Sequence, residues 1–131
     1  MFRTLCILFA AVAVVLCSGC KTAVDNSNRS AEELCLYMMR QTGGTFDGMM
    51  AIEPIRASEG FALKIANRQV AFYKFNLKWK KARAKIEYVD KNGFIYIYGE
   101  KFSAVSHGSF IMVDYDTNPM RDQLLEAFRK F

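Results

Sequence analysis

The sequence predicts an α+β fold: one small domain with an antiparallel sheet of about four to five strands and an N-terminal, a middle and a C-terminal helix packed mainly on one side. The chain has 131 residues, enough for one hydrophobic core but too few for two. Segments with strand-like and helix-like apolar spacing follow one another, without an internal repeat. A hairpin signal joins two of the strand-like segments, as in an antiparallel sheet.

The first residues are predicted to be a secretory signal and not a part of this fold. Met1, Phe2 and Arg3 form a short positive start, and Leu5–Cys17 then contains no charged or strongly polar residue. As a helix, that apolar run would rise only about 20 Å, whereas the hydrocarbon core of a bilayer is roughly 30 Å thick. A membrane-spanning anchor is therefore not expected, and the predicted signal peptide is excluded from the fold.

A cysteine motif follows the apolar run directly. Leu16-Cys17-Ser18-Gly19-Cys20 resembles the lipobox of bacterial lipoproteins, in which two small residues precede a cysteine that receives the lipid. The resemblance covers the signal alone, and Cys17 stands where the family usually has leucine, which predicts slower processing. It implies cleavage before Cys20 and acylation of this cysteine, palmitate included, with several acyl chains giving stable anchoring. The alternative is an ordinary secretory signal that leaves Cys20 as a free thiol.

The resemblance also implies a place in the bacterial cell envelope, with the domain outside the membrane that holds the anchor. Lys21 resembles the outer-membrane sorting pattern of some Gram-negative bacteria, which would favour an outer membrane facing the periplasm. Cys6 and Cys17 would leave with the signal and Cys20 would be lipidated, so Cys35 remains alone and no disulfide framework is expected. The chain's net charge of +5 falls by only one with the signal, so the mature protein is mildly basic.

A polar stretch separates Cys20 from the first predicted helix. Residues 21–29 contain Lys, Thr, Asp, Asn and Ser with almost nothing apolar, which is typical of a flexible tether. Fully extended, this stretch would reach about 30 Å. The predicted organisation is thus a signal over 1–19, a lipidated cysteine and tether over 20–29, and a single domain over 30–131.

The first helix of the domain is predicted over 31–41. Ser30 and Glu33 form a capping box, in which each side chain accepts a hydrogen bond from a free backbone N–H of the first turn. Apolar residues recur at helical spacing, and a Gly-Gly pair then ends the helix. Cys35 lies on or beside the apolar face, where a thiol has a raised pKa and is usually inert.

Strands are predicted in the next part of the chain. Residues 45–55 contain a short strand that their proline limits to a sheet edge. Residues 61–65 alternate in polarity, and Asn67-Arg68 makes the turn of a hairpin. Over 73–80, apolar and mostly aromatic residues alternate with lysines and an asparagine. This spacing predicts one aromatic face packed against helices and one basic face in water.

A second helix, two strands and a third helix complete the predicted domain. The helix over 80–90 is ended by an Asn-Gly pair. Residues 94–98 and 109–115 are rich in aromatic and β-branched side chains and predict strands joined by a loop. Asn118-Pro119 predicts the start of the last helix, because asparagine is a good cap and proline has a suitable φ for the first turn.

Few residues offer catalytic chemistry. His107 is the only histidine and lies in the hydroxyl-rich segment 103–109, without the strand-turn-helix arrangement of a nucleophile elbow. It is interpreted as an exposed loop residue, and the alternative is a small enzyme that uses His107 with a nearby serine or Cys35. Asp114 and Asp116 would share a strand face, but two acids alone are a weak indication of calcium, and solvated charges at a strand end are the favoured interpretation. The sequence predicts no enzyme, no metal and no cofactor.

A basic run with interleaved aromatic residues is the clearest candidate for binding. It lies within residues 74–85, and no acid follows it before Glu87. An exported protein seldom meets nucleic acid, so an anionic envelope polymer or an anionic lipid surface is the expected ligand. The alternative is a solvated basic face that aids solubility. The candidate residues are Lys74, Lys78, Lys80, Lys81, Arg83 and Lys85.

Three hypotheses for function remain at this point. The favoured one is a membrane-anchored, non-enzymatic module of the envelope with a structural or interaction role, whose partner is an envelope protein or polymer. The second is binding of an anionic polymer or lipid surface through the stretch Lys74–Lys85, which should weaken with salt. The third is a small enzyme that uses His107. The molecular task and the oligomeric state do not follow from the sequence.

Overall fold

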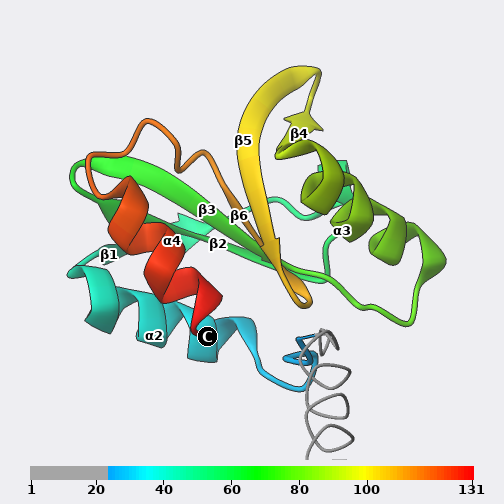
Figure 1. Ribbon diagram of the computed structural model, residues 1–131, viewed down its shortest axis with the longest axis horizontal. Coiled ribbons are helices and arrows are strands. Elements are labelled where there is room, and N and C mark those ends of the chain that lie inside the picture. The colour runs from blue at the N-terminus through cyan, green and yellow to red at the C-terminus, as the bar shows by residue number, and fades with distance from the viewer. Residues whose placement is uncertain (1–23) are drawn as a thin grey trace, which may run out of the picture.

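A six-stranded antiparallel sheet organises residues 24–131, the part of the chain that this computed structural model describes (Figure 1). The strand order is β1-β2-β3-β6-β5-β4, so the two halves of the sheet meet where β3 pairs with β6. The predicted α+β class is confirmed, with six strands in place of four to five. The strands are β1 (Thr45–Met49), β2 (Glu59–Ile65), β3 (Arg68–Lys74), β4 (Phe94–Ile97), β5 (Glu100–His107) and β6 (Phe110–Val113).

Helices cover both faces of the sheet, two on one side and one on the other (Figure 1). Because side chains alternate along a strand, β3 contributes to both cores: Val70 and Phe72 pack with α2 and α4, whereas Ala71 and Tyr73 pack with α3. The helices are α2 (Ala31–Thr42), α3 (Lys80–Asn92) and α4 (Arg121–Arg129), and a 3-10 turn, η1 (Glu53–Ile55), precedes β2.

The predicted ends of α2 and α3 are confirmed. Ser30 Oγ accepts a hydrogen bond from the Glu33 N–H at 3.1 Å, and the Glu33 carboxylate accepts one from the Ser30 N–H at 3.5 Å. Gly43 and Gly93 cap the C-terminal ends of α2 and α3 with φ of 72° and 75°. This left-handed conformation strains residues that carry a Cβ, so the glycines end the helices where the sequence predicted.

Two predicted chain reversals are displaced by one or two residues. The hairpin turn between β2 and β3 uses Ala66 and Asn67, whose φ values of 51° and 62° match a type I′ turn, and not Asn67-Arg68. Asn118 is buried, and its side chain accepts a hydrogen bond from the Met120 N–H at 2.8 Å. It therefore organises the turn before α4, and the helix itself begins at Arg121.

The prediction of a loop between the strands at 94–98 and 109–115 is wrong. Glu100–His107 forms β5, which pairs with β4 along one side and β6 along the other. Ala104 packs in the core beneath α3, and Val105 packs against the core of the opposite face. The serine-rich composition hid this strand because strand formation depends more on pairing and packing than on intrinsic propensity. His107 consequently lies at the end of a strand and is half-buried, so its interpretation as an exposed loop residue is wrong.

The single strand predicted over 73–80 is wrong beyond its first two residues. β3 ends at Lys74, and Val70–Tyr73 is buried on both faces, so no basic face of this strand is in water. The Phe75 N–H donates to the Ser109 carbonyl at 2.8 Å, and the chain then turns away from the sheet. Trp79 directly precedes α3 and is 57% exposed.

The second half of the predicted tether is packed on the domain. Asn26 is only 3% exposed, and its side chain bridges the turn between β5 and β6. Asn26 Oδ1 accepts from the Ser109 N–H at 2.8 Å, and Nδ2 donates to the His107 carbonyl at 3.0 Å. A Cβ at Gly108 would collide with this side chain, so glycine is needed there. We call these contacts of Asn26 with residues 107–109 the N-terminal clamp; a flexible tether can extend no further than residue 25.

Arg29 ties the same segment to the C-terminus and to β3. Its guanidinium lies 3.5 Å from the centroid of the Phe131 ring and donates to the Phe131 carbonyl. The Arg29 carbonyl accepts from Lys74 Nζ at 2.6 Å. The segment before α2 is thus held at three places on the domain. The predicted signal over 1–19 and Cys20 lie outside the described residues.

Replacing Asn26 with alanine is expected to lower the free energy of unfolding by about 2–3 kcal/mol, because a buried N–H and a buried carbonyl would lose their partner. Asn28→Ala is the matched control, since Asn28 is exposed two residues further on, and its effect should stay within about 0.5 kcal/mol. Urea unfolding followed by circular dichroism measures both variants. Equal effects of the two substitutions would contradict the clamp.

Candidate functional site

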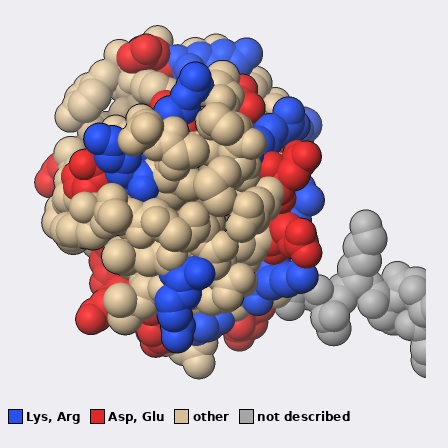
Figure 2. Space-filling model, turned by 90° about the vertical axis from the view of Figure 1, so that its left-hand side faces the viewer, with Lys and Arg blue, Asp and Glu red and all other residues tan. Residues whose placement is uncertain are grey.

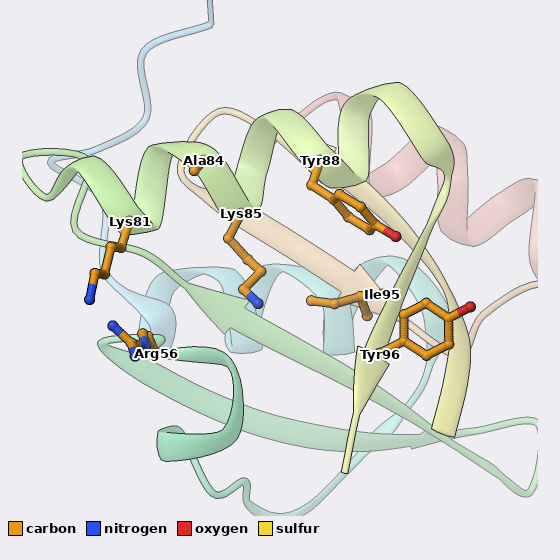
Figure 3. A pocket seen from close by; sticks show the side chains of 7 residues that line it. All are labelled: Arg56, Lys81, Ala84, Lys85, Tyr88, Ile95 and Tyr96. Carbon is orange, nitrogen blue, oxygen red and sulfur yellow. The ribbon is translucent and has the colours of Figure 1, made fainter. Parts of the chain in front are cut away.

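A groove of about 440 Å³ lies between α3, β4 and the turn after η1 (Figure 3). Its walls combine three basic side chains with two tyrosines and two small or apolar residues. No aspartate or glutamate of the described residues lines this groove. We call this the basic groove; its lining residues are Arg56, Lys81, Ala84, Lys85, Tyr88, Ile95 and Tyr96.

The wall of the groove on α3 follows from helical spacing. Lys81, Lys85 and Tyr88 are four and three residues apart and therefore lie on one side of the helix. Ala82 and Val89, on a neighbouring side, are buried against the sheet and hold the helix in place. In Figure 3, Lys85 reaches from α3 toward Ile95 of β4, so this ammonium group lies at the apolar floor of the groove.

Arg56 is a groove residue that sequence reasoning missed. It caps the C-terminal end of η1 in the left-handed region, with φ of 58°, and its N–H donates to the Glu53 carbonyl at 3.3 Å. This conformation is uncommon for a residue with a side chain. The path of the turn places Arg56 across from Lys81 (Figure 3). No spacing along the chain connects these two residues, so no local pattern could have paired them.

Within the described part of the chain, the groove cations form no ion pair with a carboxylate. Among residues 24–131, the ion pairs within 4 Å are Arg29 with Glu33 and Lys130 with Glu126, both far in the chain from the groove. Cations gathered in a hollow with apolar walls concentrate positive potential, since the walls exclude water and focus the field. The lining of the groove therefore favours a positive electrostatic potential.

Two further residues of the predicted basic run border other hollows. Lys80 and Trp79 border a second hollow that shares Arg56 and Lys81 with the basic groove, so the two form one continuous surface. Lys78 borders a third hollow beside Ser27. The predicted run is thus spread around the N-terminal end of α3 and does not form a single line.

Lys74 also lines this third hollow, and both Lys74 and Arg83 donate hydrogen bonds to backbone carbonyls of the domain. Lys74 Nζ donates to the Arg29 carbonyl at 2.6 Å and lies 5.8 Å from the centroid of the Phe110 ring. The Arg83 guanidinium donates to the carbonyls of Leu77 and Lys78 at 2.8 and 3.2 Å. Arg83, although exposed, therefore organises the loop before α3, and Lys74 joins β3 to the segment before α2.

His107 and Cys35, the residues considered for catalysis, are not arranged as a nucleophile and its base. His107 lies against the Phe128 ring with centroids 5.8 Å apart, and burial, then the positive charge of Arg129, lowers its pKa. Burial raises the pKa of the Cys35 thiol, and the Glu32 carboxylate raises it further. A thiol with a raised pKa is a weak nucleophile at neutral pH. Among the described residues, the His107 ring forms no hydrogen bond with a serine or with Cys35.

The two aspartates considered as metal ligands stand at the end of β6. Asp114 has φ of 62°, and burial, followed by the charges of Asp116 and Glu100, raises its pKa. Asp116 Oδ1 instead accepts a hydrogen bond from Ser103 Oγ at 2.9 Å. Within residues 24–131, no three His, Cys, Asp or Glu side chains come together in a way that would hold a metal ion.

The opposite side of the molecule has a different charge pattern. Figure 2 shows the side that is on the left in Figure 1, where α2, α4, β1 and the β2–β3 turn lie. Basic and acidic side chains are interspersed there over a largely uncharged surface. The acid-free cluster of cations in the basic groove is therefore a local feature and does not simply follow from the basic composition of the chain.

No family model, curated protein or solved structure matches this chain. Within residues 24–131, no helix combines the length and the apolar character that crossing a bilayer requires.

Proposed function

We propose that the protein is a non-enzymatic interaction module of the bacterial cell envelope, anchored to a membrane by lipid on Cys20, which binds an anionic envelope polymer through the basic groove. The observation that carries this proposal is the convergence of Arg56, Lys81 and Lys85 in a hollow whose lining includes no acid. The lipobox-type sequence before Cys20 supports the anchor and the envelope location.

The side chains of the groove suit the repeating anions of a polymer. The Arg56 guanidinium is planar and can donate two parallel hydrogen bonds to a carboxylate or a phosphate, while the two lysines act as point charges. Lys81 and Lys85 are about 6 Å apart along the helix axis. The groove continues into the hollow beside Trp79, which favours an extended ligand over a small one.

A non-enzymatic role agrees with the surroundings of the reactive residues. A protonated Cys35 thiol and a histidine packed on Phe128 supply no activated nucleophile. The groove itself is lined by three cations, two tyrosines and apolar groups, and its cations can bind anions. Binding is therefore the chemistry that the geometry favours.

Charge reversal in the groove is expected to weaken polymer binding. Arg56→Glu and Lys85→Glu should each weaken binding of polyphosphate and polygalacturonate about tenfold, the equivalent of about 1.4 kcal/mol. Binding should also fall as salt rises, because exposed charges are screened. Titration calorimetry on the purified protein measures both effects. Lys64→Glu is the control: it makes the same charge change at an exposed position of β2 that does not line the groove.

The control separates a specific site from general attraction. If Lys64→Glu weakens binding as much as Lys85→Glu does, only the net charge matters and the groove is not the site. Binding that is independent of salt, or absence of binding to both polymers, would equally contradict the proposal.

A further inference from the structure

We infer that the loop between β3 and α3, residues 75–79, together with Lys80, forms a contact with anionic phospholipid headgroups of the membrane that holds the anchor. The inference rests on the proposed lipidation of Cys20 and does not require polymer binding at Arg56, Lys81 and Lys85, although Trp79 and Lys80 also border the hollow that continues the basic groove. It follows from the place at which the chain leaves the folded domain, from the residues around that place and from their chemistry.

The N-terminal clamp determines where the anchor leaves the domain. Asn26 is buried and bonded to the β5–β6 turn, so only residues 21–25 remain between the domain and Cys20. Fully extended, this segment reaches about 17 Å, roughly half of what the whole predicted tether would span. The side of the domain on which the N-terminal clamp lies is therefore held close to the headgroups.

The loop 75–79 lies beside the clamp. Ser27, the residue after Asn26, lines a hollow of about 460 Å³ with Ser58 and the segment Lys74–Lys78. The hydrogen bond from Lys74 Nζ to the Arg29 carbonyl joins the same two segments. In Figure 1, the segment before α2, the β5–β6 turn and the loop before α3 all lie along the lower side of the domain. This side would face the membrane.

The exposed side chains of this loop match a headgroup region. Lys78 and Lys80 are exposed on either side of Trp79, which is itself 57% exposed. Lysines are attracted to anionic headgroups, and tryptophan is enriched at the level of the headgroups. The acid in the neighbouring segment is Asp25, whose carboxylate accepts a hydrogen bond from Ser27 Oγ at 2.8 Å. Within residues 24–29 and 75–80, Asp25 is the one acid against Arg29, Lys78 and Lys80, so these two segments together carry a net positive charge.

The loop is also held in shape before any membrane contact. The Arg83 guanidinium donates to the carbonyls of Leu77 and Lys78, and Asn76 Oδ1 accepts from the Lys78 N–H at 3.1 Å. Because the backbone around Trp79 is already bonded, less conformational entropy is lost when the loop meets the headgroups.

Trp79 is the only tryptophan of the chain and can report this contact directly. The full lipidated protein, extracted from membranes with detergent, is reconstituted into phosphatidylcholine vesicles with and without phosphatidylglycerol, using brominated lipids as quenchers. With phosphatidylglycerol, Trp79 emission should shift to the blue and be quenched. Lys78→Glu combined with Lys80→Glu should remove about half of the quenching, since the cations that attract the surface are reversed.

Two further variants separate the clamp from the groove. Asn26→Ala should reduce quenching while the protein stays on the vesicles, because the anchor remains but the orientation is lost; Asn28→Ala should leave it unchanged. Lys85→Glu, in the basic groove, should also leave quenching unchanged. If Lys85→Glu lowers it as much as the Lys78 and Lys80 variant does, the assigned loop is wrong.

The remaining outcomes distinguish failure of this inference from failure of the anchor. Protein that sediments with both kinds of vesicle while Trp79 stays unquenched would overturn the headgroup contact and leave the proposed anchor intact. Equal quenching with and without phosphatidylglycerol would overturn the role of headgroup charge. Protein that sediments with neither kind of vesicle would overturn the proposed anchor and this inference together.

Discussion

Replacing Phe72 with alanine is expected to lower the free energy of unfolding by about 3–5 kcal/mol. The ring is fully buried, and its centroid lies 5.1 Å from that of Phe61 and 6.1 Å from that of Phe128. β3 is paired on both sides, with β2 and β6, so its backbone cannot move to fill the cavity. Phe128 would also lose a partner, and the packing of α4 on the sheet would weaken.

Urea unfolding of the variant measures this effect against a matched control. Phe46→Ala removes the same ring from an edge strand where it is 52% exposed, so it should cost less than about 1 kcal/mol. Similar losses for the two variants would contradict a core in which β3 is buried by helices on both faces.

Cys20→Ser is expected to have the largest effect on location, releasing nearly all of the protein from its membrane. Each buried methylene of an acyl chain contributes about 0.8 kcal/mol, so loss of several chains removes the anchor. The wild-type protein should have an intact mass that begins at Cys20 and includes acyl groups. Cys35→Ser is the control, because this half-buried cysteine lies in α2, away from the lipobox, and it should keep both the lipid and the membrane location.

An intact mass that begins elsewhere and carries no acyl group would contradict the anchor. The chain would then be a soluble exported protein or one held by its uncleaved signal, and Cys20 would be a thiol. The basic groove would remain a candidate for polymer binding, since the residues that form it do not depend on the lipid. The headgroup contact of the loop before α3 would fail, because it requires the short tether.

Local elements were predictable because their signals involve residues close together in the chain. The capping box of Ser30 and Glu33 and the glycines that end α2 and α3 act over one helical turn. β5 was not predictable in this way, since its serines indicate a loop and only pairing with β4 and β6 makes it a strand.

The candidate site was predictable only as a composition. The basic run over 74–85 was visible in the sequence, but the different roles of its residues were not. Lys81 and Lys85 line the groove, whereas Lys74 and Arg83 are hydrogen-bonded to backbone carbonyls within the domain. The expected strand over 73–80 would have placed all of its lysines on one face. Helical spacing from Lys80 onward, together with the turn that carries Arg56, produced a different grouping.

The sequence by itself therefore determined the class of fold, the ends of α2 and α3, the surplus of positive charge and the expectation of a lipid anchor at Cys20. These follow from short-range geometry and composition. Only the tertiary structure decided that Arg56 stands across from Lys81, that β5 joins the sheet and that Asn26 locks the start of the domain onto residues 107–109. The physical reason is that such contacts join segments distant along the chain, and the packing of the whole sheet and its helices selects them.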